Sequence, residues 1–75
     1  MAEQRLLIIE DDPAIGTNLE RALRNAGYDC ERAESAAEAR RVSDPPDLVL
    51  LDLGLPDADG VDVARELLAR WPNTP

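Results

Sequence analysis

Two short runs of consecutive hydrophobic residues stand out along the chain, LLII at positions 6–9 and LVLL at positions 48–51. Neither run alternates with polar residues. A continuous apolar run of this length is typical of a strand covered on both faces, as in a parallel sheet. Residues 28–33 form a half-polar run, which indicates a strand at an edge. We therefore predict three strands, with residues 48–51 in a central one.

Apolar residues at helical spacing follow the first predicted strand. Asp12 is of a type that caps a helix, and Pro13 fits the first turn. Gly27 suits the left-handed position that ends a helix. The residues expected to face the sheet share the spacing of one helix face. They are Ile15, Leu19, Ala22, Leu23 and Ala26.

Two further helices are predicted. Ser35 and Glu38 have the spacing of a capping box, which predicts a helix over residues 35–43. The sequence DPPD at positions 44–47 ends that helix. A third helix is expected to begin near residues 59–61 and to end before Pro72. The predicted apolar faces are Ala36, Ala39 and Val42 in the second helix, and Val61, Ala64, Leu67, Leu68 and Trp71 in the third.

Strands and helices thus alternate from one end of the chain to the other. Alternation with short loops favours an α/β fold with parallel strands and right-handed crossovers. In such open sheets, ligands bind beyond the carboxyl ends of the strands. The chemistry of this chain is therefore expected at that edge of the sheet.

Composition excludes several classes of function. The chain has 75 residues, 16 acidic residues, 8 arginines and neither lysine nor histidine, which makes its net charge −8. Nucleic-acid binding needs clustered cations, so we expect no such contact by this segment. A histidine base or a Walker-type lysine is excluded. Cys30 is expected to be a small buried strand residue. No membrane span or signal peptide is predicted, so we expect a cytoplasmic chain without membrane contact.

Acidic residues directly follow both of the most apolar predicted strands. Glu10 and Asp11 follow the first strand, and Asp52 follows the third. If these strands are neighbours, three carboxylates converge, and their mutual repulsion favours a bound divalent cation. Mg²⁺ accepts such carboxylates together with carbonyl oxygens, and the loop near Gly54 could supply one. A carboxylate in such a pocket could also attack phosphorus and form an acyl phosphate.

Acids at helix starts often serve only as caps, and we assign that role to Asp12, Asp59 and Asp62. A calcium loop around Asp57 is disfavoured, because a strand precedes it and Leu55 would be its first ligand. An aspartyl phosphatase would need a second acid at position 54, which is glycine. A dinucleotide-binding loop would need G-x-G-x-x-G after the first strand, where this chain has EDDPAI.

The motifs LLIIEDDP and VLLDLGLPDADG, in this order and spacing, resemble the receiver domain of bacterial two-component response regulators. The resemblance covers the whole chain. It implies a flavodoxin-like, doubly wound parallel sheet of which residues 1–75 are the N-terminal part of a single domain. Only the first three βα units are present, with strand order 2-1-3. The third strand then lies at an edge.

The resemblance also implies roles for individual residues. Asp52 matches the aspartate that accepts a phosphoryl group from a histidine kinase or phosphotransfer protein. Glu10 and Asp11 match the acidic pair that holds Mg²⁺, with Asp11 the more direct ligand. Gly54 matches the residue whose backbone carbonyl is a ligand. Receivers of this kind catalyse their own phosphorylation and dephosphorylation.

The chain departs from the family pattern at its C-terminal end. Receivers have five βα units, a threonine or serine that ends the fourth strand, and a lysine that ends the fifth. Here WPNTP stands where the fourth strand would begin, Thr74 precedes it, and there is no lysine. These 75 residues alone are therefore expected to be incompetent for phosphotransfer and to form an oligomer or exchange strands. The alternative is a non-catalytic, receiver-like module for binding or dimerisation.

Overall fold

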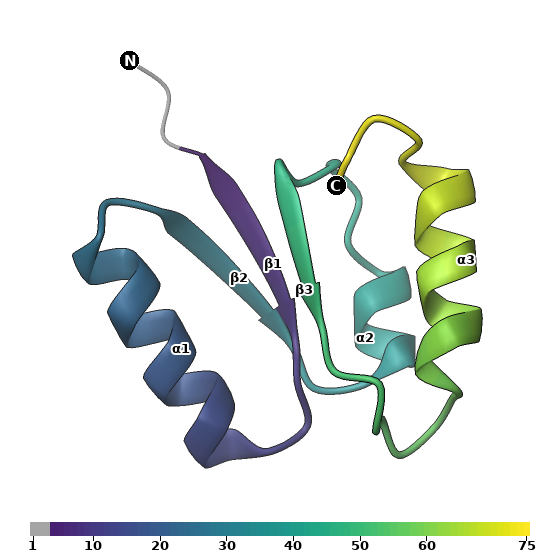
Figure 1. Cartoon of the computed structure of the whole chain (residues 1–75), viewed down its shortest axis with the longest axis horizontal. Coiled ribbons are helices and arrows are strands. Elements are labelled where there is room, and N and C mark those ends of the chain that lie inside the picture. The colour runs from purple at the N-terminus through teal and green to yellow at the C-terminus, as the bar shows by residue number, and fades with distance from the viewer. Residues whose placement is uncertain (1–3) are drawn as a thin grey trace.

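The computed structural model describes residues 4–75, in which three parallel strands alternate with three helices (Figure 1). The strands are β1 (Arg5–Ile9), β2 (Asp29–Ala33) and β3 (Leu48–Leu51), and the helices are α1 (Pro13–Asn25), α2 (Ala36–Arg40) and α3 (Gly60–Arg70). The strand order is β2-β1-β3, so the predicted α/β fold and the order 2-1-3 are confirmed. No helix within residues 4–75 is long and apolar enough to cross a membrane.

β1 is the middle strand of the sheet. Ile9 pairs with Ala33 of β2 on one side and with Leu51 of β3 on the other. The prediction from the apolar run that residues 48–51 form a central strand is therefore wrong for the described part of the chain. β3 lies at an edge, as the family resemblance implied, and its four residues are only partly buried. β2 lies at the other edge, as its half-polar sequence predicts.

Helices cover both faces of the sheet, with α1 on one face and α2 and α3 on the other (Figure 1). Side chains of a strand alternate between its two faces. Leu7 and Ile9 of β1 accordingly join the larger core cluster under α2 and α3, whereas Leu6 and Ile8 join the smaller cluster with Cys30. Cys30 is buried and free, as expected of a small strand residue.

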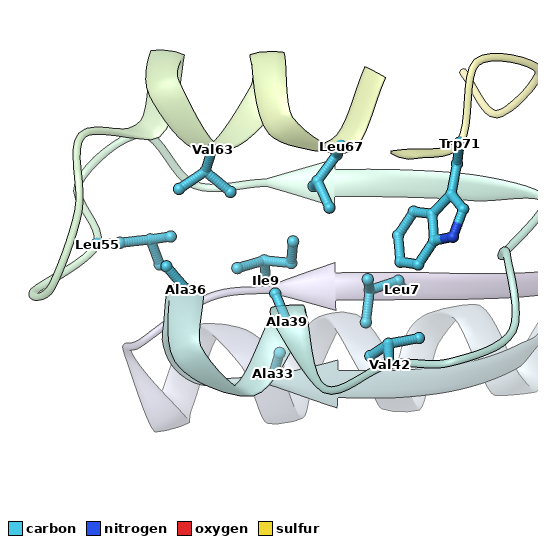
Figure 2. Close-up of a cluster of buried hydrophobic side chains, with 10 residues drawn as sticks. All are labelled: Leu7, Ile9, Ala33, Ala36, Ala39, Val42, Leu55, Val63, Leu67 and Trp71. Carbon is cyan, nitrogen blue, oxygen red and sulfur yellow. The ribbon is translucent and has the colours of Figure 1, made fainter. Parts of the chain in front are cut away.

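α3 contributes one narrow face to the larger core. Val63, Leu67 and Trp71 point toward the sheet and α2 (Figure 2). Their spacing of four residues places them in one row along the helix. The predicted face of α3 is thus partly wrong: Val63 was absent from it, and Val61 and Leu68 are 49% and 59% exposed. The apolar stripe in the sequence is wider than the face that the sheet covers.

α1 also buries less of its predicted stripe than expected. It packs mainly on β2, where Gly16 is buried and Leu23 is partly buried. Ile15 and Leu19 remain 50% and 37% exposed. The reason is lateral position, because a helix centred on the β2 side leaves the flank of its stripe nearest β3 uncovered.

The caps of α1 and α3 agree with the sequence. The carboxylate of Asp12 accepts the N–H groups of Ala14 and Ile15, and that of Asp59 accepts the N–H of Val61. Gly27 follows α1 with φ of 98°, the left-handed conformation that glycine adopts without strain.

α2 is shorter than the predicted helix over residues 35–43, because it ends at Arg40. The guanidinium of Arg70 donates to the carbonyls of Arg40 and Val42, so α3 supplies donors to carbonyls that a helix ending here leaves without an intrahelical partner. The Ser35 hydroxyl accepts the Glu38 N–H as predicted. The Glu38 carboxylate accepts the N–H of Glu34 instead of Ser35, so the capping box is only half formed.

Candidate functional site

Backbone hydrogen bonds carry the sheet one residue past its strands and so fix the acidic side chains. The N–H of Asp52 donates to the carbonyl of Ile9 at 2.9 Å, and the N–H of Glu10 donates to the carbonyl of Ala33 at 2.9 Å. Both residues therefore stand at the carboxyl edge of the sheet on rigid elements. This is the edge at which open α/β sheets bind ligands.

The three predicted carboxylates meet at this edge. Glu10, Asp11 and Asp52 each offer a carboxylate oxygen, and these oxygens all lie within 4.8 Å of one another. Glu10 is buried, Asp52 is half-buried and Asp11 is exposed. The site is thus walled on the Glu10 side and open on the Asp11 side, so an ion or a phosphoryl group could enter from solvent.

The pKa values of the Glu10 and Asp52 carboxyl groups are shifted in opposite directions. Burial raises the pKa of Glu10, and the neighbouring Asp52 raises it further. The N–H of Gly54 donates to Asp52 Oδ1 at 3.0 Å and lowers the pKa of Asp52, and hydrogen bonding with Glu10 lowers it as well. Of the two groups, Asp52 therefore loses its proton more readily, as a nucleophile or a metal ligand must.

The chemistry of the donor set fits a hard divalent cation. Three carboxylates crowd together without a lysine in the chain to neutralise them. Mg²⁺ prefers such oxygen ligands and keeps several waters, which an open site permits. Gly54 is held beside Asp52 by the hydrogen bond just described, and the predicted role of its carbonyl as a ligand stays a prediction.

A groove beside the site leads from the acids along the α1 face of the sheet. Its volume is 420 Å³, and its lining includes Ile8, Ile15 and Leu50 with Glu10 and Asp52 at one end.

Asp57 is a residue whose role the sequence did not reveal. Its carboxylate accepts the N–H groups of Ala36 and Ala37 at 2.9 and 3.0 Å, so the loop after β3 caps α2 from a distance of about twenty positions. These two hydrogen bonds lower the pKa of Asp57. A local sequence motif cannot predict a cap that a distant loop supplies. The bonds also engage the carboxylate that a calcium loop would have used, which agrees with the low rank given to that alternative.

Thr74 is not part of the site. Its hydroxyl donates to the carbonyl of Pro46 at 2.8 Å, beside the amino end of β3, whereas Asp52 follows the carboxyl end. The acidic site of the described residues therefore consists of groups from the loops after β1 and β3.

Comparisons with known proteins find similar chains. The family described as "Response regulator receiver domain" matches residues 6–75. The transcriptional regulatory protein VxrB of Vibrio cholerae is 44% identical over 61 residues, which cover 81% of this chain and 25% of that protein. The response regulator MprA of Mycolicibacterium vanbaalenii is 38% identical over 73 residues, which cover 95% of this chain and 32% of that protein.

Solved structures of response regulators and their receiver domains are also similar to this chain. The non-phosphorylated receiver domain of HemR from Leptospira biflexa has a TM-score of 0.91 and 36% identity, covering 97% of this chain and 60% of that one. The response regulator TrrA from Thermotoga maritima, in complex with Mg²⁺ and BeF, has a TM-score of 0.88 and 33% identity, covering 95% of this chain and 64% of that one. The chain thus spans about a quarter to a third of those two curated relatives.

Proposed function

The chain belongs to the response regulator receiver family, and from this premise we propose that Asp52 is a phosphoacceptor whose phosphorylation depends on Mg²⁺. The observation that carries the proposal is the convergence of Glu10, Asp11 and Asp52 at the carboxyl ends of two neighbouring parallel strands. A helix cap explains one acid at such a position, but it does not explain three from two strands.

Asp52 is the acceptor among the three acids for a physical reason. The Gly54 N–H holds the pKa of Asp52 down, whereas burial holds the pKa of Glu10 up, so Asp52 is the more acidic of these two carboxyl groups. In the proposed step, an oxygen of Asp52 attacks the phosphorus of a phosphohistidine. The O–P bond forms as the N–P bond breaks, and the electron pair of that bond returns to the imidazole nitrogen.

Glu10, Asp11 and Asp52 would hold the Mg²⁺ ion, with the Gly54 carbonyl as a fourth protein ligand. Bound there, the ion supplies positive charge against the oxygens of the phosphoryl group. The chain's own groups set the geometry: the Ile9–Asp52 hydrogen bond orients the nucleophile, and the Gly54 N–H occupies one of its oxygens and leaves the other to react. The complex of the relative TrrA with Mg²⁺ and BeF supports this assignment.

The partner of this chemistry would be a histidine kinase or a phosphotransfer protein, as for receiver domains in general. A cytoplasmic setting and self-association of the chain also stay predictions. The alternative function is a non-catalytic binding or dimerisation module of the same fold.

Phosphorylation can be tested with acetyl phosphate and Mg²⁺ on this segment within a receiver domain of five βα units, followed by intact-mass measurement, because the 75 residues alone are expected to be incompetent. We expect one added phosphoryl group, labile as acyl phosphates are, that is lost in Asp52→Asn and lost when EDTA removes the metal. Asp12→Asn is the matched control, because asparagine caps a helix about as well as aspartate. This variant should be phosphorylated like the unchanged chain.

Two outcomes would contradict the proposal. A phosphoryl group that persists in Asp52→Asn would place the acceptor elsewhere. A folded five-unit receiver domain containing this segment that gains no phosphoryl group with acetyl phosphate or with a cognate kinase would favour the binding module. Circular dichroism of each variant separates these results from loss of folding.

A further inference from the structure

The loop that follows β3, residues 53–58, is hydrogen-bonded to α2 through the side chain of Asp57. Its carboxylate accepts the N–H of Ala36 at 2.9 Å and the N–H of Ala37 at 3.0 Å. In the described part of the chain, these are the hydrogen bonds that connect this loop with an element remote from it in sequence. We name residues 53–58 the β3 loop and the two hydrogen bonds the Asp57 bridge.

The Asp57 bridge spans the carboxyl edge of the sheet. Asp52 follows β3 and Ala36 follows β2, and β1 lies between these two strands. To reach α2, the β3 loop must therefore pass the carboxyl end of β1, where Glu10 belongs to the acidic site. The loop thus begins at the candidate acceptor and is fixed to an element that starts beyond the acidic site.

The chain between Gly54 and Asp57 is too short and too constrained to act as a flexible linker. Asp57 lies three positions after Gly54, a span of at most about 10 Å. Leu55 is buried in the same core cluster as Ala36 (Figure 2), and the ring of Pro56 restricts its φ angle. Apolar packing has no preferred direction, so Leu55 anchors the loop without orienting it. The two hydrogen bonds of the bridge are directional and supply the orientation.

The two ends of the β3 loop are held separately from its outer part. At the start, the N–H of Asp52 donates to the carbonyl of Ile9. At the end, a methyl group on Gly60 would overlap the Cα of Leu53, so the first turn of α3 packs directly on the residue after the candidate acceptor. The Asp57 bridge is the polar contact that holds the part between these ends.

Capping alone does not account for the bridge. Ser35 already caps α2 from its own sequence, because its hydroxyl accepts the Glu38 N–H at 3.1 Å. Asp12 and Asp59 likewise cap the helices that they directly precede. Asp57 instead caps a helix that lies about twenty positions earlier in the chain. Its distinctive property is that it connects α2 with the loop of the candidate acceptor.

We propose that Asp57 is a positioning residue of the acidic site, which holds the β3 loop so that the Gly54 N–H engages Asp52 and the Gly54 carbonyl is available to a metal ion. The metal part of this inference rests on the proposed function. Coupling between two sites is reciprocal. Mg²⁺ bound at the acids should therefore slow hydrogen exchange of the Ala36 and Ala37 N–H groups.

The first test needs no metal and uses this segment within a receiver domain of five βα units. The ¹H–¹⁵N NMR signal of Gly54 reports the hydrogen bond of its N–H to Asp52. Asp57→Ala should shift this signal, and Asp57→Asn should shift it less, because the amide oxygen keeps one of the two acceptors. Ser35→Ala is the matched control, since it removes the local cap of α2 and should leave the Gly54 signal in place. Circular dichroism checks that each variant is folded.

The second test measures the Mg²⁺ dissociation constant of the same domain by calorimetric titration. Asp57→Ala should raise it about tenfold, at the lower end of the range for residues that orient metal ligands. Asp57→Asn removes the same negative charge but keeps an acceptor, so it should raise the constant less. Ser35→Ala should leave it unchanged.

Three results would overturn the inference. These are a Gly54 signal that Asp57→Ala does not move, an effect of Ser35→Ala as large as that of Asp57→Ala, and equal losses of Mg²⁺ affinity in Asp57→Asn and Asp57→Ala. The second result would reduce the role of Asp57 to the stability of α2, and the third would reduce it to charge. If the unchanged domain binds no Mg²⁺, the proposed function fails, whereas the NMR test still decides the role of Asp57.

Discussion

β1 and β3 have almost the same kind of sequence but very different surroundings. LLII in β1 and LVLL in β3 are both uninterrupted apolar runs. Leu7 and Ile9 of β1 are 1% and 0% exposed, whereas every residue of β3 is only partly buried. β1 has a strand on each side, and β3 has a strand on one side only. The apolar sequence of a strand thus indicates how much of its side-chain surface can be buried favourably. The neighbouring elements determine how much of that surface is buried.

The largest expected effect comes from replacing one leucine in each strand by alanine, at positions on the same face of the sheet. Leu7→Ala should lower the free energy of unfolding by about 2–5 kcal/mol, because it leaves a cavity in a closed core. Leu51→Ala should cost about half as much, because Leu51 is half-buried. A domain of this length has a total stability of about 4–11 kcal/mol, so Leu7→Ala could unfold it.

Denaturant unfolding at low protein concentration measures both losses. An equal loss for the two variants would contradict the comparison and would mean that β3 is covered in solution as β1 is.

The helices that follow the two strands, α1 after β1 and α3 after β3, can be compared through their glycines. A methyl group on Gly60 would overlap the backbone Cα of Leu53, and the loop after β3 would have to shift. Gly60→Ala should therefore cost about 1–3 kcal/mol of stability. A methyl group on Gly16 in α1 would meet first the guanidinium end of Arg32, which is the far end of a flexible side chain.

Gly16→Ala should accordingly cost less than Gly60→Ala in thermal unfolding, and alanine's better helix propensity of about 1 kcal/mol offsets part of the loss. In an Arg32→Ala background, Gly16→Ala should be neutral or stabilising. Failure of that background to rescue Gly16→Ala would show that another contact opposes the methyl group.

Mg²⁺ would link the carboxyl ends of β1 and β3. At a concentration about ten times its dissociation constant, the ion should stabilise the fold by about 1.4 kcal/mol. Thermal unfolding with and without Mg²⁺ measures the effect. Asp11→Asn should abolish most of it, whereas Asp12→Asn, which preserves the cap, should retain it. A folded chain that shows no response to Mg²⁺ would count against Glu10 and Asp11 as ligands.

The smallest expected change in stability comes from removing the Asp57 carboxylate, which lies in the loop after β3 and caps α2. The pKa of Asp57 is lowered by the N–H groups of Ala36 and Ala37, so its contribution to stability is present above its unfolded pKa of about 3.9 and is lost as the pH falls through the lower folded value. Asp57→Ala should reduce stability at neutral pH and flatten the acid side of the pH–stability curve.

Asp44→Ala is the matched control for Asp57→Ala, because Asp44 is an exposed aspartate in a loop. Its curve should follow that of the unchanged chain. If Asp57→Ala and Asp44→Ala had the same curve, the distant cap would contribute nothing measurable.

The order of the elements could be predicted from the sequence because its signals are local. Strand runs, the caps Asp12 and Asp59, and the left-handed Gly27 each depend on a few neighbouring residues. The candidate site was predictable for a related reason: Glu10, Asp11 and Asp52 follow two apolar strands, and parallel strands bring their carboxyl ends to one edge. Their roles as ligands and acceptor stay predictions.

Contacts between distant segments required the tertiary structure. Local pattern cannot show that Arg70 donates to a carbonyl at the end of α2, that Asp57 caps the start of α2, or that α3 turns Val63 inward and Leu68 outward. Each depends on where a separate element lies in space. The sequence by itself determined which segments are strands and helices and which acids follow them, because backbone preferences act over a few residues. The tertiary structure alone decided which apolar surface is covered, because burial is a property of neighbours that may be far away along the chain.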